Sequence, residues 1–435
     1  MTKLPIILKD NSDITENKEH PIIMELLNKN LSYLDKENFI IFPTSVKESE
    51  DLGENNFIFE SKNDKIYTCN IAGIIKKEND EIQIKTRFFN NNNQTIDYFL
   101  QYMLKKVLNY NITKNTTQSD NTGTYHDLLV YLFPFYLKRA MKKGLYKEYI
   151  NKRYNDFNVK GSIDVIQNIN KNIPFSGKIA YKVREFSYDN KITQIIRHTL
   201  EKIKREYNFE FLDDKFLKEN IYILQQNTKS YSKFHLDNIL QDNIKNPVRH
   251  GYFSEYFPLQ KLCIQILKSK KVEFAEDSSE VHGILIDVAW LWEKYLNTLL
   301  NEKFEHSDNR KRENGIYLFN NPSKKIVYPD FYNKDKKIVL DAKYKKLGNN
   351  SIGREDLYQI ITYLHVLKAE KAGIIYPDAE KMECNNMGKL GGYGGEIFKK
   401  SFKIPQDVSS YSEFADEIKL SEDKIFDGIW EIINI

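Results

Sequence analysis

Two short apolar segments joined by a charged turn, each with an aspartate near one end, most constrain the fold of this chain. The first contains Tyr328-Pro329-Asp330, and the second runs from the turn Asn333–Lys337 through Ile338-Val339-Leu340 into Asp341-Ala342-Lys343. A strand, a tight turn and a second strand would bring both carboxylates onto neighbouring strands, with a lysine two residues beyond the second. Two carboxylates and an ammonium group at one sheet edge suit divalent-metal chemistry on phosphodiesters. The hairpin therefore predicts a nuclease site.

The predicted site offers the oxygen donors that a hard divalent cation requires. Mg²⁺ (or Mn²⁺) keeps several of its waters, so one or two carboxylates and a substrate phosphate complete its shell. We expect Asp330 and Asp341 to be ligands, with the backbone carbonyl of Ala342 as a further oxygen. Lys343 would orient the attacking water and stabilise the developing negative charge. Glu293, on the preceding predicted helix, would add a carboxylate directly or through water.

The elements around this hairpin follow the order helix, three strands, helix, strand. This αβββαβ order resembles the core of the restriction-endonuclease-like nucleases, whose signature is PD-(D/E)xK, and implies a mixed sheet. On the second helix, Gln359 and Tyr363 are four residues apart and share a face. In many enzymes of the superfamily that the chain resembles, a Gln-x-x-x-Tyr helix flanks the active site. The predicted elements are a helix at Leu285–Phe304, strands at Gly315–Phe319, Ile326–Tyr332 and Lys337–Tyr344, a helix at Ile352–Lys368 and a strand at Ala372–Tyr376.

Before residue 270 the sequence predicts a β-rich segment and then helices. Asn79-Asp80-Glu81 is typical of a hairpin turn and would pair Ile71–Ile75 with Ile82–Thr86. Apolar residues recur with helical spacing from Ile96, again over Leu128–Leu145 and in three later stretches, at 191–226, 234–242 and Lys261–Lys268. We therefore predict a multidomain protein of mixed α+β and α/β class. Its parts would be a β-rich N-terminal domain at 1–95, a mainly helical middle region at 96–270 and the nuclease domain at 271–435.

Composition restricts where such a protein would work and how it would meet DNA. A net charge of +4 over 435 residues is only mildly basic, so contacts with DNA would depend on local patches. One basic cluster closes the predicted helix at 128–145 and has two interpretations, a solvated helix end or a phosphate-contacting patch. Three widely spaced cysteines and the absence of a membrane-length apolar run predict a cytoplasmic protein. The basic cluster comprises Lys138, Arg139, Lys142, Lys143 and Lys147.

The sequence predicts no nucleotide-binding site in this chain. Gly348–Gly353 has the glycine spacing of a phosphate loop, but Arg354-Glu355 follows where that loop needs Lys-Ser or Lys-Thr. We expect a loop before a helix there, so any nucleotide hydrolysis would come from a partner.

Several stretches are similar to McrC-type subunits, the nuclease component of McrBC 5-methylcytosine restriction systems. The similarity is strongest from 283 to 377 and extends in patches toward the N-terminus. Upstream, Gly161-Ser162-Ile163-Asp164-Val165 resembles the family's Gly-x-Ile-Asp segment, and the hairpin from Gly73 to Thr86 resembles its N-terminal β-element. That hairpin ends in Ile84-Lys85-Thr86-Arg87-Phe88, where the family commonly has an Ile-Leu-Pro-Lys-like sequence. The segments that carry the resemblance in the C-terminal part are 286–295, 341–345 and 356–363.

This resemblance implies a two-part protein of an antiviral restriction system. Its C-terminal part would cut DNA, and its N-terminal half, including the β-rich domain at 1–95, would dock onto a hexameric McrB-like AAA+ GTPase and stimulate it. Two alternatives remain open. The chain could be a self-sufficient LlaJI-type restriction endonuclease that recognises DNA directly, or a non-catalytic scaffold that activates an AAA+ motor.

Overall fold

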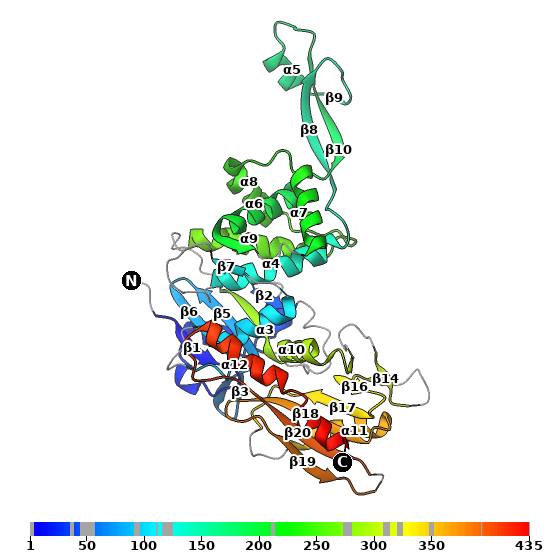
Figure 1. Ribbon diagram of the computed structural model, residues 1–435. Coiled ribbons are helices and arrows are strands. Elements are labelled where there is room, and N and C mark those ends of the chain that lie inside the picture. The colour runs from blue at the N-terminus through cyan, green and yellow to red at the C-terminus, as the bar shows by residue number, and fades with distance from the viewer. Residues whose placement is uncertain are drawn as a thin grey trace. The chain divides into compact units, whose positions relative to one another are not determined.

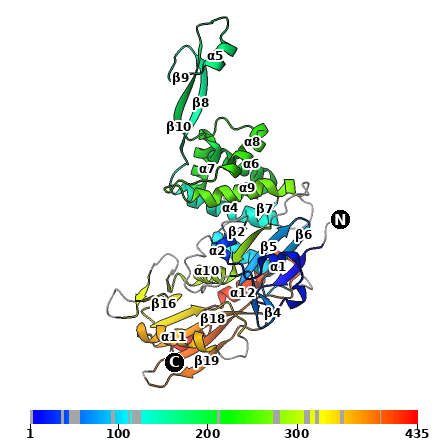
Figure 2. The same ribbon diagram turned by 180° about the vertical axis from the view of Figure 1, so that it is seen from behind.

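The chain folds into two compact units, which together form a multidomain protein of mixed α/β class (Figures 1 and 2). Unit 1 comprises residues 1–110, 120–125 and 275–435, and unit 2 comprises residues 111–119 and 126–274. The computed structural model describes residues 4–34, 39–43, 57–90, 96–109, 112–114, 125–209, 214–272, 281–307, 314–319, 325–347, 352–392 and 394–434.

A five-stranded sheet in unit 1 has the order β1-β6-β5-β12-β2. The predicted hairpin is confirmed, because β5 and β6 are antiparallel with Gly73 opposite Ile84 and Ile75 opposite Ile82. The strand β12 lies between β5, to which it is antiparallel, and β2, to which it is parallel. The bounds are Ile6–Lys9 for β1, Phe39–Phe42 for β2, Ile71–Lys77 for β5, Asp80–Lys85 for β6 and His282–Asp287 for β12.

The strand β12 corrects the predicted start of a helix at Leu285. The chain remains extended to Asp287, whose side chain then caps α10 (Val288–Leu300) by accepting a hydrogen bond of 3.0 Å from the Trp290 N–H. Because β12 completes the N-terminal sheet, residues 1–95 and 271–435 share one compact unit, whereas the sequence predicted two separate domains.

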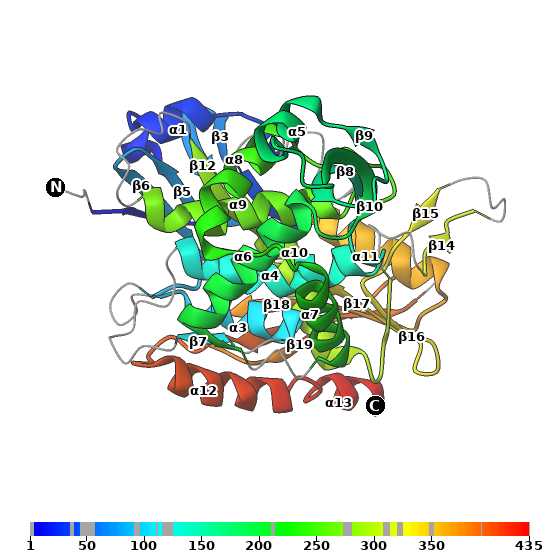
Figure 3. The same ribbon diagram turned by 90° about the horizontal axis from the view of Figure 1, so that it is seen from above.

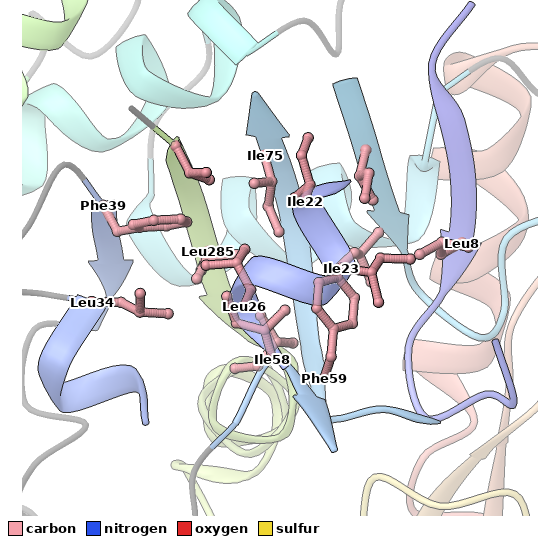
Figure 4. Packing of buried hydrophobic residues seen from close by; sticks show 14 of the residues in the cluster. Leu8, Ile22, Ile23, Leu26, Leu34, Phe39, Ile58, Phe59, Ile75 and Leu285 are labelled. Atoms are coloured by element: carbon pink, nitrogen blue, oxygen red, sulfur yellow. The ribbon is translucent and has the colours of Figure 1, made fainter. Parts of the chain in front are cut away.

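Side chains on one face of this sheet form a shared apolar core (Figure 4). Leu285 of β12 and Ile75 of β5 pack there with Phe39 of β2. The short helix α1 (Pro21–Leu26) covers this face with residues that are fully or almost fully buried. Residues more than 200 positions apart in the sequence therefore depend on one core. The remaining elements of this region are η1 (Thr15–Asn17), α2 (Leu31–Leu34), β3 (Phe59–Lys62) and β4 (Lys65–Thr68).

The second sheet of unit 1 has the order β13-β16-β17-β18-β20-β19 and is mixed. Strands β16 and β17 are antiparallel, whereas β17, β18 and β20 run parallel to one another. The helix α11 (Arg354–Val366) packs on β17 and β18 and buries Ile360 and Leu364. The strands are β13 (Glu305–His306), β16 (Phe331–Asn333), β17 (Ile338–Ala342), β18 (Lys371–Asp378), β19 (Cys384–Lys389) and β20 (Glu396–Lys403).

Two predicted strands differ from the observed ones. The predicted strand Ile326–Tyr332 is divided, because β15 (Ile326–Val327) pairs with β14 (Ile316–Tyr317) in a separate hairpin and β16 begins only at Phe331 (Figure 3). Pro329 lies in the break, where the lack of an N–H group suits a gap in the ladder. The predicted strand Gly315–Phe319 thus lies outside the main sheet, and the two-residue strand β13 occupies the edge position instead.

A partly buried carboxylate ties α10 to neighbouring helices of unit 1. Glu422 on α12 (Tyr411–Asp423) accepts hydrogen bonds from the hydroxyl groups of Tyr102 and Tyr295, at 2.9 and 2.8 Å. Tyr102 belongs to α3 (Tyr98–Leu108) and Tyr295 to α10. The position of α10 is therefore fixed by α3 from the N-terminal part of the chain and by α12 from the C-terminal part. A short helix, α13 (Ile429–Asn434), follows α12 (Figure 3).

Unit 2 is built from helices and a β-arm. The predicted helix at 128–145 is α4 (Tyr125–Met141), and the predicted stretch 191–226 is two helices separated by β11. Two members of the basic cluster, Lys138 and Arg139, form ion pairs of 2.6 Å with Asp214 and Glu255. The other elements are β7 (Ile112–Lys114), α6 (Lys191–Glu206), β11 (Tyr207–Phe209), α7 (Lys215–Asn227), η4 (Lys233–His235), α8 (Leu236–Lys245) and α9 (Tyr256–Val272). Across the described parts of both units, no helix is long and apolar enough to cross a membrane.

The β-arm extends from these helices as a long antiparallel hairpin (Figure 1). The motif Gly161-Ser162-Ile163-Asp164 builds its end. A side chain at Gly161 would place Cβ 2.1 Å from the carbonyl oxygen of Lys182, so only glycine allows this close approach. Asp164 caps the N-terminus of α5 and forms an ion pair of 3.0 Å with Lys182. The arm consists of β8 (Glu148–Asp156), β9 (Ser162–Ile163), α5 (Val165–Lys171) and β10 (Ile179–Ser187).

Because β12 packs closely on β5, a single methyl group added at Gly73 should strongly lower the stability of the fold. A Cβ atom there would lie 2.0 Å from the carbonyl oxygen of Ile284, and Gly73 has a φ of +155°. We expect Gly73→Ala to lower the free energy of unfolding by about 2 kcal/mol or more, measured by urea denaturation. Gly391→Ala is the control, because a Cβ atom at Gly391 meets nothing within 4 Å. Equal stability of the two variants would contradict the described packing of β12 on β5.

Candidate functional site

The hairpin of β16 and β17 brings the two predicted carboxylates together. Phe331 lies opposite Leu340, so the antiparallel register continued by one residue places Asp330 opposite Asp341. The backbone N–H of Ala342 donates a hydrogen bond of 2.7 Å to Oδ2 of Asp330. This bond orients the Asp330 side chain across the hairpin and toward the strand that carries Asp341.

Lys343 lies beside Asp341, as its position two residues further along the chain predicts. Its Nζ atom is 2.9 Å from Oδ2 of Asp341, a carboxylate that is only 2% exposed. The backbone N–H of Lys343 donates to the carbonyl of Ile375 on β18, at 2.9 Å. The ammonium group is thus held at the end of the strand by a continued sheet bond and by a buried counter-charge.

Gln359 and Tyr363 connect the helix α11 to the same site. Gln359 accepts a hydrogen bond of 2.7 Å from Lys343, and its amide nitrogen donates to the Tyr363 hydroxyl at 2.9 Å. The Tyr363 hydroxyl donates in turn to the carbonyl of Tyr328, at 3.3 Å. This chain of bonds links α11 to the segments just before β16 and just after β17, on the face that the four-residue spacing predicts.

Asp356, on α11, places a further carboxylate near Lys343 and Lys345. It is buried and forms an ion pair with Lys345 at 2.7 Å, and its Oδ1 atom lies 3.9 Å from the Lys343 ammonium group. The side chains of Asp341, Asp356 and Gln359 therefore surround the Lys343 ammonium group and favour its charged form. The carboxylates of Asp341 and Asp330 raise the pKa of Lys343 above its usual value, against burial that lowers it.

Glu293 lies on α10, near enough to Asp330 for its charge to raise the pKa of that carboxyl. Its Oε1 atom is 3.3 Å from Nε2 of His306 and 3.4 Å from Nζ of Lys294. Nδ1 of His306 is 2.7 Å from the carbonyl of Asp330, so it must carry the proton, since a carbonyl only accepts. Lys294 Nζ lies 2.7 Å from Nε2 of the same ring and can donate to it.

His306 and Lys294 are members of the site that sequence reasoning did not identify. His306 lies on β13, a strand of two residues that is too short to give an alternating pattern. Its ring stacks on Phe331 at 5.2 Å between centroids. No second histidine stands at ligand spacing in the sequence, and Lys294 is one basic residue among many, so neither carried a local signal.

The carboxylates make this site electrostatically unfavourable without a cation. Burial raises the pKa of Asp330 well above its usual value, and the charges of Asp341 and Glu293 raise it further. The Lys343 ammonium group and the Ala342 N–H act in the opposite direction but do not cancel these effects. Two opposed carboxylates with a backbone carbonyl beside them match the donors that Mg²⁺ prefers. The described residues contain no group of three His, Cys, Asp or Glu side chains placed to hold a metal ion.

Comparisons with known proteins agree on one system. A model of the family described as McrBC 5-methylcytosine restriction system component matches residues 66–377. The fold is similar to a chain of the refined half-complex from a tetradecameric assembly of Thermococcus gammatolerans McrB AAA+ hexamers with bound McrC. That match has a TM-score of 0.50 and 16% identity, and it covers 97% of this chain and 100% of the other.

A second solved structure, the cryo-EM structure of the Thermococcus gammatolerans McrBC complex, matches at a TM-score of 0.31 and 14% identity. It covers 69% of this chain and 88% of the other. A comparison with curated proteins finds no match.

The electrostatics of the site predict that the Asp330 carboxylate destabilises the fold. Because the pKa of Asp330 is raised by folding, stability falls as the pH rises above the ordinary carboxyl range, and the loss is present at neutral pH. We expect Asp330→Asn to raise the Tm of the metal-free protein at pH 7 by about 2 °C or more. The gain should shrink as the pH is lowered toward that range, because both states are then protonated.

Differential scanning calorimetry in the presence of EDTA measures this effect. Asp335→Asn is the matched control, because Asp335 is exposed in the turn of the same hairpin, and we expect a change of at most about 1 °C. A lower Tm for Asp330→Asn would mean that the carboxylate stabilises the fold through its bond to Ala342.

Proposed function

The chain belongs to the family of McrBC 5-methylcytosine restriction system components, and on that premise we propose that it is the DNA-cleaving subunit of such a system. The observation that supports this proposal most strongly is the pair Asp330 and Asp341, opposed across the hairpin with the Lys343 ammonium group 2.9 Å from Asp341. This arrangement has the charges and donors that hydrolysis of a phosphodiester requires.

Asp330, Asp341 and the carbonyl of Ala342 are the proposed ligands of Mg²⁺ or Mn²⁺. When bound, such an ion lowers the pKa of a coordinated water and neutralises charge on the scissile phosphate. The carboxylates relieve their own repulsion by binding it, because a divalent cation offsets both negative charges. Glu293 adds a further carboxylate on the α10 side, directly or through water.

Lys343 is the proposed group that positions the attacking water and stabilises the charge that develops on the phosphate. Gln359 fixes its ammonium group from α11, at 2.7 Å, and Tyr363 fixes Gln359. The surrounding carboxylates keep Lys343 protonated, so it acts as a hydrogen-bond donor and a fixed positive charge at neutral pH.

The order of elements around the site supports a restriction-endonuclease-like core. A helix, α10, precedes the antiparallel strands β13, β16 and β17, and α11 then leads to the parallel strand β18. The mixed sheet that results is the one expected from the αβββαβ pattern. The hairpin of β14 and β15 is an insertion between β13 and β16.

We further propose that an McrB-like AAA+ GTPase hexamer is the partner of this chain. The similar structure from Thermococcus gammatolerans contains McrB AAA+ hexamers with bound McrC. The present sequence has no phosphate-loop motif of its own, as Arg354-Glu355 follows the glycine-rich segment. Movement along DNA driven by nucleotide hydrolysis would therefore depend on the partner.

The arm tip, defined as residues 157–175, is the surface best suited to dock onto that partner. Four of its large apolar side chains are each more than 70% exposed, namely Phe157, Ile166, Ile173 and Phe175. Exposed apolar clusters of this kind mark protein interaction sites. The sequence placed the docking surface in the N-terminal half of the chain, and the arm tip lies within that half.

The nuclease assignment predicts that single changes at the site abolish DNA cleavage. Asp341→Asn removes a metal ligand and Lys343→Ala removes the ammonium group, so we expect cleavage to fall by about a hundredfold or more in either variant. The assay uses the full chain with its AAA+ partner, GTP, Mg²⁺ and methylated plasmid DNA. Asp335→Asn and Lys336→Ala, both in the exposed turn, are the controls.

The outcomes of this assay also separate the alternatives. Cleavage by the purified chain with Mg²⁺ alone would favour the self-sufficient endonuclease. Normal cleavage by both site variants would sink the nuclease assignment and leave the scaffold role.

If the arm tip is the docking surface, changes in it should lower stimulation of the partner's GTP hydrolysis. The double change Phe157→Ser and Phe175→Ser removes two exposed aromatic groups, and we expect stimulation of the partner's GTP hydrolysis to fall about tenfold or more. Phe234→Ser is the control, because Phe234 is 94% exposed in unit 2 but lies outside the arm. Stimulation that survives the double change intact would exclude the arm tip as the docking surface.

A further inference from the structure

We propose that Arg87, which follows β6 of the N-terminal sheet, is a positioning residue for the nuclease site. This inference rests on the proposed function of Asp330, Asp341 and Lys343. Arg87 touches none of the proposed reacting groups, but its guanidinium group contacts Tyr344, which follows Lys343, and reaches the start of α10 through Asn70.

Arg87 is first of all fixed in place by a buried carboxylate. Its Nη2 atom is 2.7 Å from Oδ2 of Asp10, and its Nε atom is 3.1 Å from the same oxygen. Asp10 is fully buried and Arg87 is 7% exposed. The backbone N–H of Arg87 also donates to Asp10, and Asp10 directly follows β1. The guanidinium plane therefore has one orientation.

The first outward contact of Arg87 is with the residue after Lys343. Nη1 of Arg87 donates a hydrogen bond of 3.1 Å to the carbonyl oxygen of Tyr344, and its Cζ atom lies 4.4 Å from the centre of the Tyr344 ring. The ring of Phe88 also packs on Tyr344, with its centroid 5.9 Å from that of the Tyr344 ring. The backbone that follows Lys343 is thus held in place by Arg87 and Phe88, which follow β6 of the N-terminal sheet.

The second outward contact leads to the helix of Glu293. Nη2 of Arg87 donates to Oδ1 of Asn70 at 2.5 Å, and the backbone carbonyl of Asn70 accepts from the N–H of Val288 at 3.1 Å. Val288 is the first residue of α10, whose second turn carries Glu293. One guanidinium group therefore connects the origin of α10 with the end of β17.

These contacts require an arginine. Its planar group presents donors in several fixed directions, which here reach Asp10, Asn70 and Tyr344 at once, and it stacks on an aromatic face. A lysine keeps the charge beside Asp10 but has one nitrogen and cannot hold all three acceptors in the same geometry. Arg87→Lys therefore keeps the positive charge beside Asp10 while it removes the positioning contacts.

The test compares Arg87→Lys with Arg197→Lys in the complete complex. Arg197 is a matched control because it also pairs with a carboxylate, Glu201 at 2.9 Å, and lies over a tyrosine ring, Tyr231 at 5.0 Å, but belongs to unit 2. We expect kcat for DNA cleavage to fall at least about tenfold in Arg87→Lys, with KM for DNA within about twofold. Arg197→Lys should keep both values.

A second readout does not depend on activity. Calorimetric titration of the full chain with Mn²⁺ should show at least about tenfold weaker binding for Arg87→Lys than for the native chain or Arg197→Lys, because the ligands are less well positioned. Unchanged kcat and unchanged Mn²⁺ binding in folded Arg87→Lys would overturn the proposal.

A double variant covers the case in which Arg87→Lys does not fold. Asp10→Leu combined with Arg87→Met removes both charges and avoids an unpaired buried carboxylate. If this double variant folds and its kcat falls at least about tenfold, the positioning role is supported. A folded double variant with the kcat of the native chain would overturn the proposal. Asp341→Asn, assayed in parallel, keeps the two claims apart, because cleavage by that variant would refute the nuclease assignment itself.

Discussion

The structure is organised around two carboxylates, Asp330 and Asp341, that lie directly opposite each other on one hairpin. Asp330 and Asp341 repel each other, and the pKa of Asp330 shows that burial adds to the cost. Lys343 offsets part of this repulsion at 2.9 Å from Asp341. A site of this kind persists only where the surrounding sheet and helices hold it rigidly, which is common at functional sites.

The rigidity comes from elements that are distant in the sequence. The strand β12 inserts into the N-terminal sheet and passes directly into α10, so the first 85 residues and the sheet that carries Asp341 fold as one unit. The helix α11 supplies Gln359 and Tyr363, which link Lys343 to the segment before Asp330. Arg87 extends this support, because it joins the two sheets at the peptide that follows Lys343.

The parts of the fold that local chemistry determines could be predicted from the sequence. The turn residues and apolar runs around Asp330 and Asp341 indicate a hairpin, and the spacing of Gln359 and Tyr363 indicates one helix face. The sequence could not show that 282–287 is a strand, because its apolar run continues into the helix without a break and its partners β5 and β2 lie about 200 residues away. His306, on a two-residue strand, gave no periodic signal at all.

The position of a bound metal ion would decide whether Asp330 and Asp341 form a metal site. A crystal of the protein soaked in Mn²⁺ and measured at the manganese absorption edge would locate the ion from its anomalous scattering. We expect one strong peak in contact with the carboxylates of Asp330 and Asp341 and with the carbonyl oxygen of Ala342. A peak bound instead by Glu293 and His306, or no peak near the hairpin at saturating Mn²⁺, would contradict this expectation.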